Sequence, residues 1–219
     1  MSLGCTAAAA HAEQSWFAFE AGIGGSAYAQ AADGLWLQEG FPHTVKLTAP
    51  AIEAGITGDL YQTSHWGIAY HVDYAWLGAI HSDGHATSDA NYNLATKTER
   101  VAMPLANFSG SGHDMGFLAT IEPHYDYAGW RFGIEGGPYF HKPTWTVDAT
   151  NQVNYIGQAP YHTHFVDDEG WHLGYVLGAS VAYKRFSLRY QYFANGSKTG
   201  NPIPVIWTHT HVVTANYAF

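Results

Sequence analysis

The last residues of the chain, 206–219, alternate between two kinds of side chain. One set is mostly apolar or aromatic: Trp207, His209, His211, Val213, Ala215, Tyr217 and Phe219. The other set is mostly small or polar: Ile206, Thr208, Thr210, Val212, Thr214, Asn216 and Ala218. Successive side chains of a strand point to opposite faces, so this period of two predicts a β-strand with one apolar-aromatic face.

The same alternation predicts seven further strands upstream. Their ranges are 14–29, 51–60, 66–78, 114–127, a strand that begins at 130, 171–183 and 186–194. In the clearest of them, Trp66, Ile68, Tyr70, Val72, Tyr74 and Trp76 share one face, and Gly67, Ala69, His71, Asp73 and Ala75 share the other. The connections alternate in length: 31–50, 79–112, 150–170 and 195–205 are long, whereas 61–65, 128–129 and 184–185 are short.

The composition favours a protein that crosses a membrane with strands. Charged residues make up 12% of the 219-residue chain, and a soluble domain carries about 25%. The mean hydropathy is only −0.17, and the sequence has no run of about 18 apolar residues, which a transmembrane helix needs. A transmembrane barrel meets both observations, because only every second residue of its strands is apolar.

The predicted fold is therefore all-β: an up-and-down, eight-stranded, antiparallel transmembrane β-barrel with four long extracellular loops. The alternative is a soluble barrel with its apolar face inside. That arrangement would leave a face of mostly Gly, Ala, Ser and Thr, with few charges, exposed to water, which argues against it.

The alternating strand that ends in Phe219 resembles the carboxy-terminal strand of bacterial outer-membrane β-barrels. The resemblance implies a location in the bacterial outer membrane. It also implies that Tyr217 and Phe219 form the signal that the barrel-assembly machinery recognises.

The amino terminus has the look of a processed leader. Ala10-His11-Ala12 fits a small-x-small cleavage site, although no basic region precedes it. We therefore expect residues 1–12 to be the remnant of a truncated signal peptide and residues 13–219 to form a single transmembrane β-barrel domain.

The face opposite the lipid carries the charges. We predict a lumen ionic network that consists of Glu20, Glu53, Asp73, Glu122, Arg131, Glu135 and Arg189. An eight-stranded barrel is just wide enough for side chains to fill it, and buried charges must be paired. The favoured interpretation is a structural polar plug in which Arg131 and Arg189 bridge several carboxylates. A narrow proton or cation path is the alternative.

Fourteen histidines raise the question of metal binding. His162-Thr-His164 and His209-Thr-His211 each place two imidazoles on one strand face, as metal ligands require, but neither pair has a neighbouring cysteine. A looser set that could meet above the barrel comprises His113, His162, His164, Asp167, Asp168 and Glu169. We predict no metal site and no cofactor.

Residues 188–196, Leu-Arg-Tyr-Gln-Tyr-Phe-Ala-Asn-Gly, resemble the strand-seven region of outer-membrane lipid A deacylases. Those enzymes carry a His-x-Ser-Asn motif on the lipid-facing wall of an eight-stranded barrel. Only Asn195 is retained here, because Tyr192 stands in place of the base and Ala194 in place of the nucleophile. A serine nucleophile needs its hydroxyl and an adjacent base, so the resemblance implies that this activity has been lost and that no residue is catalytic.

The functional prediction is a non-enzymatic outer-membrane barrel whose surface loops bind an unknown extracellular partner or lipopolysaccharide. Long loops on a rigid scaffold are the usual location of binding sites. A lipid A-modifying enzyme and a narrow pore are the alternatives. The formal net charge of −9 argues against a nucleic-acid partner.

Overall fold

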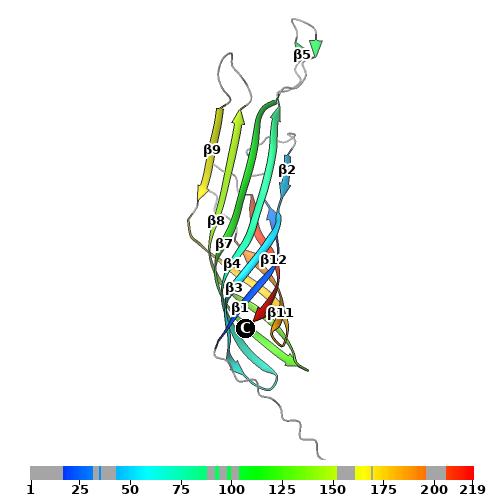
Figure 1. Ribbon diagram of the computed structural model, residues 1–219, viewed down its shortest axis with the longest axis vertical. Coiled ribbons are helices and arrows are strands. Elements are labelled where there is room, and N and C mark those ends of the chain that lie inside the picture. Colours follow the sequence, from blue (N-terminus) through cyan, green and yellow to red (C-terminus); the bar gives the residue numbers. More distant parts are fainter. Residues whose placement is uncertain are drawn as a thin grey trace, which may run out of the picture.

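The computed structural model describes residues 17–31, 35, 43–87, 92–93, 98–99, 104–151, 161–168, 170–195 and 206–219. Within these ranges, eight antiparallel strands form a closed ring, because the last strand pairs with the first (Figure 1). Around the ring they are β1 (Ala18–Gln30), β3 (Thr48–Gln62), β4 (Trp66–Thr87), β7 (Pro104–Tyr127), β8 (Trp130–Asn151), β10 (His172–Tyr183), β11 (Phe186–Ala194) and β12 (Trp207–Ala218). The predicted all-β, eight-stranded antiparallel barrel is confirmed. Among the described residues, no helix has the length and hydropathy that crossing a membrane requires.

Three short connections lie at one end of the barrel, which we call the short-turn end. Ala128 and Gly129 both adopt positive φ (52° and 83°) in the two-residue turn between β7 and β8. Lys184 does the same (φ 58°) in the turn between β10 and β11. Tyr127 pairs with Trp130 and Tyr183 with Phe186 across these turns, so the tight turns predicted at 128–129 and 184–185 are confirmed.

The outer wall of the barrel is apolar. Exposed side chains at its middle include Ile23, Ile52, Val72, Ile121 and Leu177. Their strand neighbours on the inner side are buried and mostly polar, charged or small. The predicted assignment of the apolar face to the outside is therefore confirmed. Such a wall is suited to lipid, and a closed ring satisfies every ladder hydrogen bond where lipid offers none.

Aromatic rings mark both edges of this apolar belt. Near the short-turn end, Trp66 lies 4.9 Å from Tyr125 and Trp130 lies 4.9 Å from Tyr183, between ring centroids. At the other edge, Trp171 stacks on Phe140 at 5.0 Å and on Phe117 at 6.2 Å. Amphipathic aromatic rings favour the membrane interface, so the two groups bound the membrane-spanning part.

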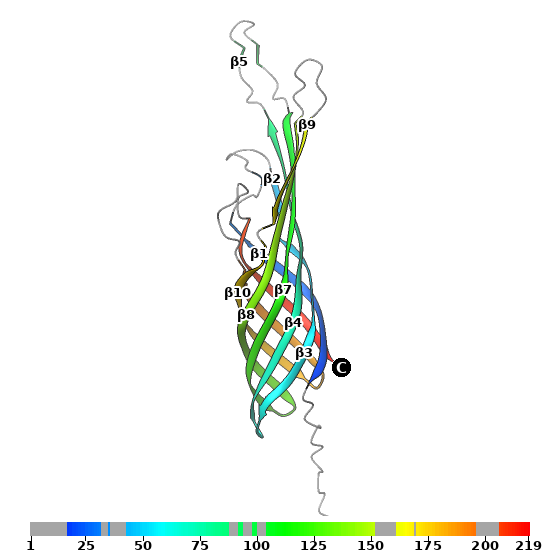
Figure 2. The ribbon, with the colours of Figure 1, turned by 90° about the vertical axis from the view of Figure 1, so that its left-hand side faces the viewer.

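Three neighbouring strands continue well past the second aromatic group. β4, β7 and β8 have 22, 24 and 22 residues, whereas about 9–11 suffice to cross the hydrocarbon. Figure 2 shows them rising above the rest of the barrel. Two short strands widen this wall: β2 (His43–Lys46) pairs with β4, and β9 (Tyr161–Asp168) pairs with β8. We call residues 43–46, 79–87, 104–113, 144–151 and 161–168 the strand extension.

The strand extension corrects the predicted loops. Residues 79–87 and 104–112 were expected to be loop and are strand, as are all of 161–168 and part of 31–50. Their outward side chains are mostly polar, because this part of the wall lies beyond the lipid. The hydrophobic alternation that identifies a lipid-facing strand is therefore missing. Two further short strands, β5 (Tyr92–Asn93) and β6 (Thr98–Glu99), pair only with each other.

A bulge in β4 marks the level where the extension begins. The register with β7 shifts between Trp76 and Ala79, and Gly78 adopts φ +82°. A Cβ at Gly78 would come within 2.1 Å of the Pro50 carbonyl oxygen, so only glycine fits. The extra residue turns both Leu77 and Gly78 inward, and the Gly78 carbonyl accepts a hydrogen bond from the Tyr28 hydroxyl at 3.0 Å.

Trp207 lies on the opposite side from the one predicted. It was grouped with His209 and His211 on the apolar-aromatic face, yet it is 2% exposed and lies inside the barrel. The register between β1 and β12 shifts between Tyr28 and Gln30, and this shift turns Trp207 inward. Inside, its ring contacts Tyr28 at 5.2 Å and its indole N–H donates to the Asn195 carbonyl oxygen at 3.2 Å.

Candidate functional site

The middle of the lumen is organised around Arg189, which β11 directs inward. The residue is 1% exposed. One guanidinium nitrogen lies 3.2 Å from Asp73 and 3.5 Å from Glu53. The other lies 3.4 Å from Glu20 and 3.6 Å from Glu135. A planar guanidinium with several fixed donors suits such a position between carboxylates of four different strands.

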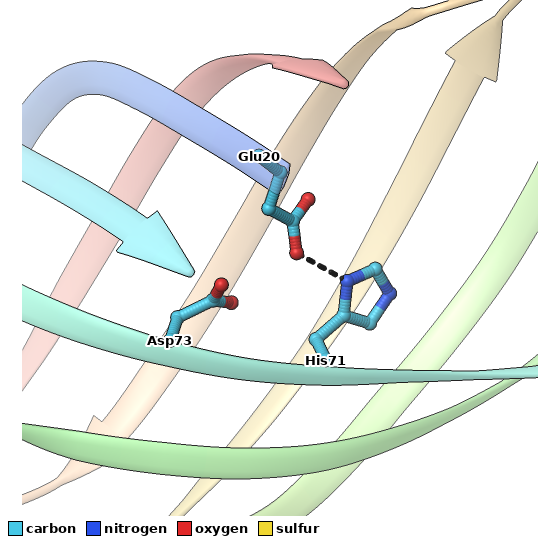
Figure 3. A group of neighbouring side chains, drawn as sticks. All are labelled: Glu20, His71 and Asp73. Carbon is cyan, nitrogen blue, oxygen red and sulfur yellow. Dashed lines mark hydrogen bonds and ion pairs between the residues drawn. The ribbon is translucent and has the colours of Figure 1, made fainter. Parts of the chain in front are cut away.

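His71 extends the network from β4. Its Nδ1 lies 2.7 Å from Glu20 Oε1, which Figure 3 shows as a dashed line, with Asp73 beside the pair. Its Nε2 lies 3.5 Å from Glu122 Oε2. Hydroxyl groups hold several of the carboxylates, as Thr120 donates to Glu135 and Ser180 to Glu122. We call Glu20, Glu53, His71, Asp73, Glu122, Glu135 and Arg189 the central network.

Arg131 lies apart from the central network, although the sequence grouped it there. Its guanidinium lies 3.0 Å from Asp59 and 3.2 Å from Asp126, near the short-turn end. The side chain is 30% exposed, in contrast to that of Arg189. Arg131 belongs to the rim because it is the first residue after Trp130, directly beyond the hairpin turn. The structure therefore places six of the seven predicted residues together and Arg131 elsewhere.

A cavity of about 380 Å³ enters the barrel from the short-turn end. At its mouth lie the turn residues Gly129, Lys184 and Arg185. Deeper lining residues include His71 and Arg189, which belong to the central network. The cavity thus connects the rim with the charged groups in the middle of the barrel.

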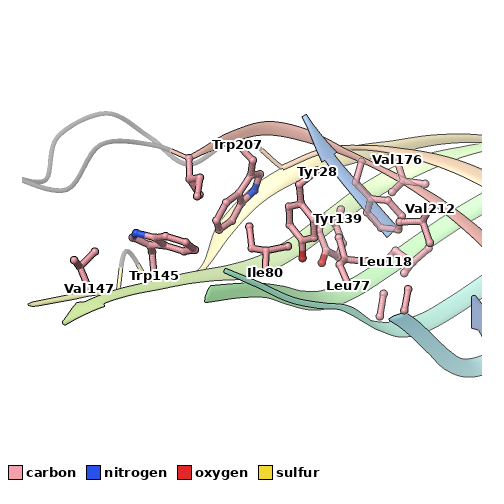
Figure 4. Packing of buried hydrophobic residues seen from close by; sticks show 14 of the residues in the cluster. Tyr28, Leu77, Ile80, Leu118, Tyr139, Trp145, Val147, Val176, Trp207 and Val212 are labelled. Carbon is pink, nitrogen blue, oxygen red and sulfur yellow. The ribbon is translucent and has the colours of Figure 1, made fainter. Parts of the chain in front are cut away.

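Beyond the central network, an apolar cluster fills the other half of the lumen (Figure 4). It includes Leu77, Leu118, Tyr139, Phe193 and Trp207, each at most 2% exposed. Phe193 packs edge-on against Tyr139, with ring centroids 4.9 Å apart. The cluster lies across the lumen between the charged centre and the strand extension.

A small polar group is embedded beside this cluster. The Asp114 carboxylate lies 3.1 Å from His141 Nδ1 and accepts a hydrogen bond from the Asn195 amide at 2.5 Å. Thr210 donates to the Asn195 side-chain oxygen at 3.1 Å. Every one of these side chains is buried. Asn195 therefore has a structural role in the lumen of this barrel.

The outward face of the strand extension is mostly polar, with Val166 as an exposed apolar exception. Side chains on neighbouring strands form hydrogen-bonded pairs: Ser109 with Asp83 at 2.8 Å, His85 with Asn107 at 2.8 Å, His162 with Thr150 at 3.0 Å and His164 with Asp148 at 2.6 Å. Opposite residues of paired antiparallel strands point to the same side, so these pairs share one face. We call this face the polar ladder.

His113 lies at the lower edge of the polar ladder, next to Thr144. Partial burial lowers the pKa of this imidazole below its usual range, so His113 is neutral near pH 7. His162 and His164 pair with Thr150 and Asp148, six and four residues farther along β8 than Thr144. His162 and His164 therefore lie farther along the wall than His113, whereas Asp168 pairs with Thr144 at the level of His113, and Glu169 lies outside the described residues.

The segment that resembles lipid A deacylases presents Tyr192 to the outside, between two histidines of β12. The Tyr192 ring centroid lies 5.0 Å from His209 and 5.6 Å from His211. The Tyr190 hydroxyl lies 2.8 Å from His211 Nδ1. No Ser, Asp or Glu side chain contacts these four rings in the described interactions, so a Ser–His–acid arrangement is not assembled there.

No protein-family model matches the chain, and no curated protein matches it. The solved structures that are similar in fold include the following three. The attachment invasion locus protein Ail of Yersinia pestis is 11% identical, with 93% of this chain and 97% of that chain covered and a TM-score of 0.34. The outer membrane protease OmpT of Escherichia coli is 8% identical, with 93% and 94% covered and a TM-score of 0.43. The toluene transporter TbuX of Ralstonia pickettii is 8% identical, with 93% and 89% covered and a TM-score of 0.26.

These likenesses concern the general class of fold and say nothing about activity. The location follows from this chain's own architecture. A closed antiparallel ring with an apolar wall, aromatic rings at both edges and short turns at one end is the construction of outer-membrane barrels. The protein is a β-barrel of the bacterial outer membrane.

Three functional features were not found from the sequence. The polar ladder lies in segments that were interpreted as loops. The rim pairs of Arg131 with Asp59 and Asp126 were missed, although the position of these residues beside the short turns was visible in the sequence. The apolar cluster was missed because the inward residues of the strand extension, such as Trp145 and Val147, resemble lipid-facing ones.

Removing the charge of Arg189 tests the importance of the central network. We expect Arg189→Met to reduce the free energy of unfolding by about 3–5 kcal/mol, because it leaves buried carboxylates without their cation. Arg131→Met is the matched control and should cost about 1 kcal/mol or less, since its ion pairs are partly solvated. Urea titrations of both variants in lipid vesicles measure the difference. Equal losses in the two variants would contradict the central role of Arg189.

Proposed function

We propose that the protein is a non-enzymatic outer-membrane barrel whose strand extension binds the saccharide part of lipopolysaccharide. The observation that supports this proposal is the polar ladder. The ladder lies on the outer face of the barrel and directly continues the lipid-facing belt. An outward side chain just beyond the membrane interface faces the headgroups of neighbouring lipids. In the outer leaflet of an outer membrane, those headgroups are saccharides.

The chemistry of the ladder supports this ligand. Hydroxyl, imidazole, amide and carboxylate groups alternate along it, and Asp83, Asp148 and His164 are exposed. Such groups donate to and accept from the hydroxyls of a sugar. Their cross-strand hydrogen bonds hold the side chains in place before a ligand arrives, which reduces the entropy lost on binding.

The two alternatives have less support. For an enzyme, the outward tyrosine and histidine rings around Tyr192 lack an acidic partner among the described contacts, and the inward charges are deeply buried. For a pore, the lumen would have to conduct past both Arg189 and the apolar cluster around Phe193. Both groups are nearly inaccessible to solvent.

Binding of the purified barrel to lipopolysaccharide core oligosaccharide tests the proposal. We expect saturable binding in detergent micelles, measured by saturation-transfer NMR or thermophoresis. The double substitution Asp148→Ala with His164→Ala removes one hydrogen-bonded pair of the ladder. It should weaken binding at least about tenfold, since lost hydrogen bonds to charged groups contribute about 1.5–3 kcal/mol each.

The matched control is a similar exposed pair at the opposite end of the barrel. The Ser64 hydroxyl lies 2.9 Å from His65 Nδ1 in the turn between β3 and β4. Ser64→Ala with His65→Ala should leave oligosaccharide binding unchanged. Absence of binding by the wild-type barrel, or equal weakening in the two double variants, would refute a saccharide site on the ladder.

We also propose that Tyr217 and Phe219 are recognised by the barrel-assembly machinery. In the folded barrel, Tyr217 packs edge-on against Phe186 at 4.9 Å and Phe219 is 67% exposed. The Phe219 ring packs edge-on against Tyr217 at 5.1 Å and otherwise faces outward, so it is accessible for recognition during assembly. Phe219→Asp should block assembly while export continues, so the outer-membrane fraction would lack heat-modifiable barrel. The control Phe17→Asp changes another exposed ring near the same end and should assemble. Normal assembly of Phe219→Asp would contradict the proposal.

A further inference from the structure

The central network contains more carboxylates than its cations can balance. Glu20, Glu53, Asp73, Glu122 and Glu135 are each at most 6% exposed. Among the described residues of this network, they face one guanidinium and one imidazole. At least three negative charges remain even when the imidazole is protonated. Buried carboxylates in this situation must bind protons or a further cation.

The imidazole of His71 is oriented as a metal ligand would be. Its Nδ1 lies 2.7 Å from Glu20 Oε1. In the neutral tautomer that donates this Nδ1–H to Glu20, the lone pair is on Nε2. Nε2 is buried and makes no hydrogen bond, although Glu122 Oε2 lies 3.5 Å away. A metal-bound histidine typically donates its other ring N–H to a carboxylate in the same manner.

Two carboxylates complete a set of ligands around Nε2. One donor atom each from His71, Glu122 and Glu135 lie within 4.8 Å of one another, and all three residues are buried. Glu135 Oε1 is buried without a hydrogen-bond partner, whereas its Oε2 accepts from Thr120. Two unpartnered atoms, Nε2 and Oε1, therefore belong to these three residues, and two others of the central network, Glu53 Oε1 and Asp73 Oδ1, lie outside the set.

We propose that His71, Glu122 and Glu135 bind a divalent first-row transition metal ion and that Glu20 orients the imidazole. One imidazole and two carboxylates suit zinc, and three protein ligands leave a position for water. A second set, Glu20 with His71 and Asp73, surrounds the other side of the ring (Figure 3). There the imidazole nitrogen already donates to Glu20, so this side is the supporting one.

The site has a route to the solvent. His71 and Glu122 line the cavity that opens at the short-turn end. A cation that enters there meets these ligands before it reaches the apolar cluster. The ion would partly neutralise the excess negative charge and so stabilise the folded barrel. The proposal is independent of saccharide binding, which uses the outward wall at the opposite end.

Zinc titration of the full barrel tests the site. The protein used carries His162→Gln and His164→Gln, which remove exposed ligands. It is treated with a chelator and titrated with Zn²⁺ in detergent. Bound metal is measured by mass spectrometry after desalting. We expect one Zn²⁺ per chain and a rise in the urea midpoint of unfolding with zinc concentration, because the ion binds the folded state.

Variants separate ligation from a general structural role. Glu135→Gln removes one ligand and also one excess charge, so this variant should fold without metal yet bind Zn²⁺ at least about tenfold more weakly. His71→Gln should lose the site, and Glu20→Gln should weaken it by about 10–100-fold as a positioning residue. His141→Gln, which changes the buried histidine paired with Asp114, should keep full affinity.

Two results would overturn the proposal. One is a wild-type barrel whose urea midpoint does not respond to Zn²⁺, which would mean that protons neutralise the carboxylates. The other is unchanged zinc affinity in a folded Glu135→Gln variant.

Discussion

The backbone of this protein must satisfy its own hydrogen bonds where lipid surrounds it, and the rest of the structure depends on that constraint. The sheet closes because β12 pairs with β1. A ring of eight strands leaves a lumen that is only wide enough for side chains. The inward residues therefore determine what the interior holds, and the outward residues determine what the wall contacts.

The interior divides into layers along the barrel axis. Rim ion pairs around Arg131 come first, then the central network around Arg189, then the apolar cluster around Tyr139 and Phe193. The central network combines ion pairs with hydroxyl donors such as Ser180 and Thr120, so most of its oxygens have partners. Among the described residues of this layer, His71 Nε2 and one carboxylate oxygen each of Glu53, Asp73 and Glu135 are buried without a hydrogen-bond partner, which gives the layer a capacity for a ligand.

Much of the fold could be predicted from the sequence, because lipid imposes a simple rule. Apolar residues at every second position, as in 66–76, identified the strands and their outward faces, and Ala128-Gly129 identified a tight turn. The rule fails where lipid ends. Past the level of Trp171 along the barrel axis, the outward residues of the wall are mostly polar. The continuation of β4, β7 and β8 was therefore not predicted. The bulge at Gly78 and the register shift near Trp207 were also invisible, because each depends on the neighbouring strand.

The sites were predicted less completely than the fold. The alternation of side chains showed which residues point into the lumen, and six of the seven proposed lumen residues do belong to one network. The alternation does not show how far along the barrel axis a residue lies, and Arg131 lies at the rim. Which carboxylates pair with which cation depends on the offset between neighbouring strands along the barrel axis. A single sequence does not contain that offset.

The central network and the apolar cluster together close the lumen to ion flow along the barrel axis. Single-channel recording in planar lipid bilayers tests this most directly, with the folded barrel added at rising concentration to symmetric KCl. We expect no conductance steps from correctly inserted, heat-modifiable barrel. Discrete, reproducible steps whose size changes in Arg189→Met would contradict it, because they would place an ion path through the central network.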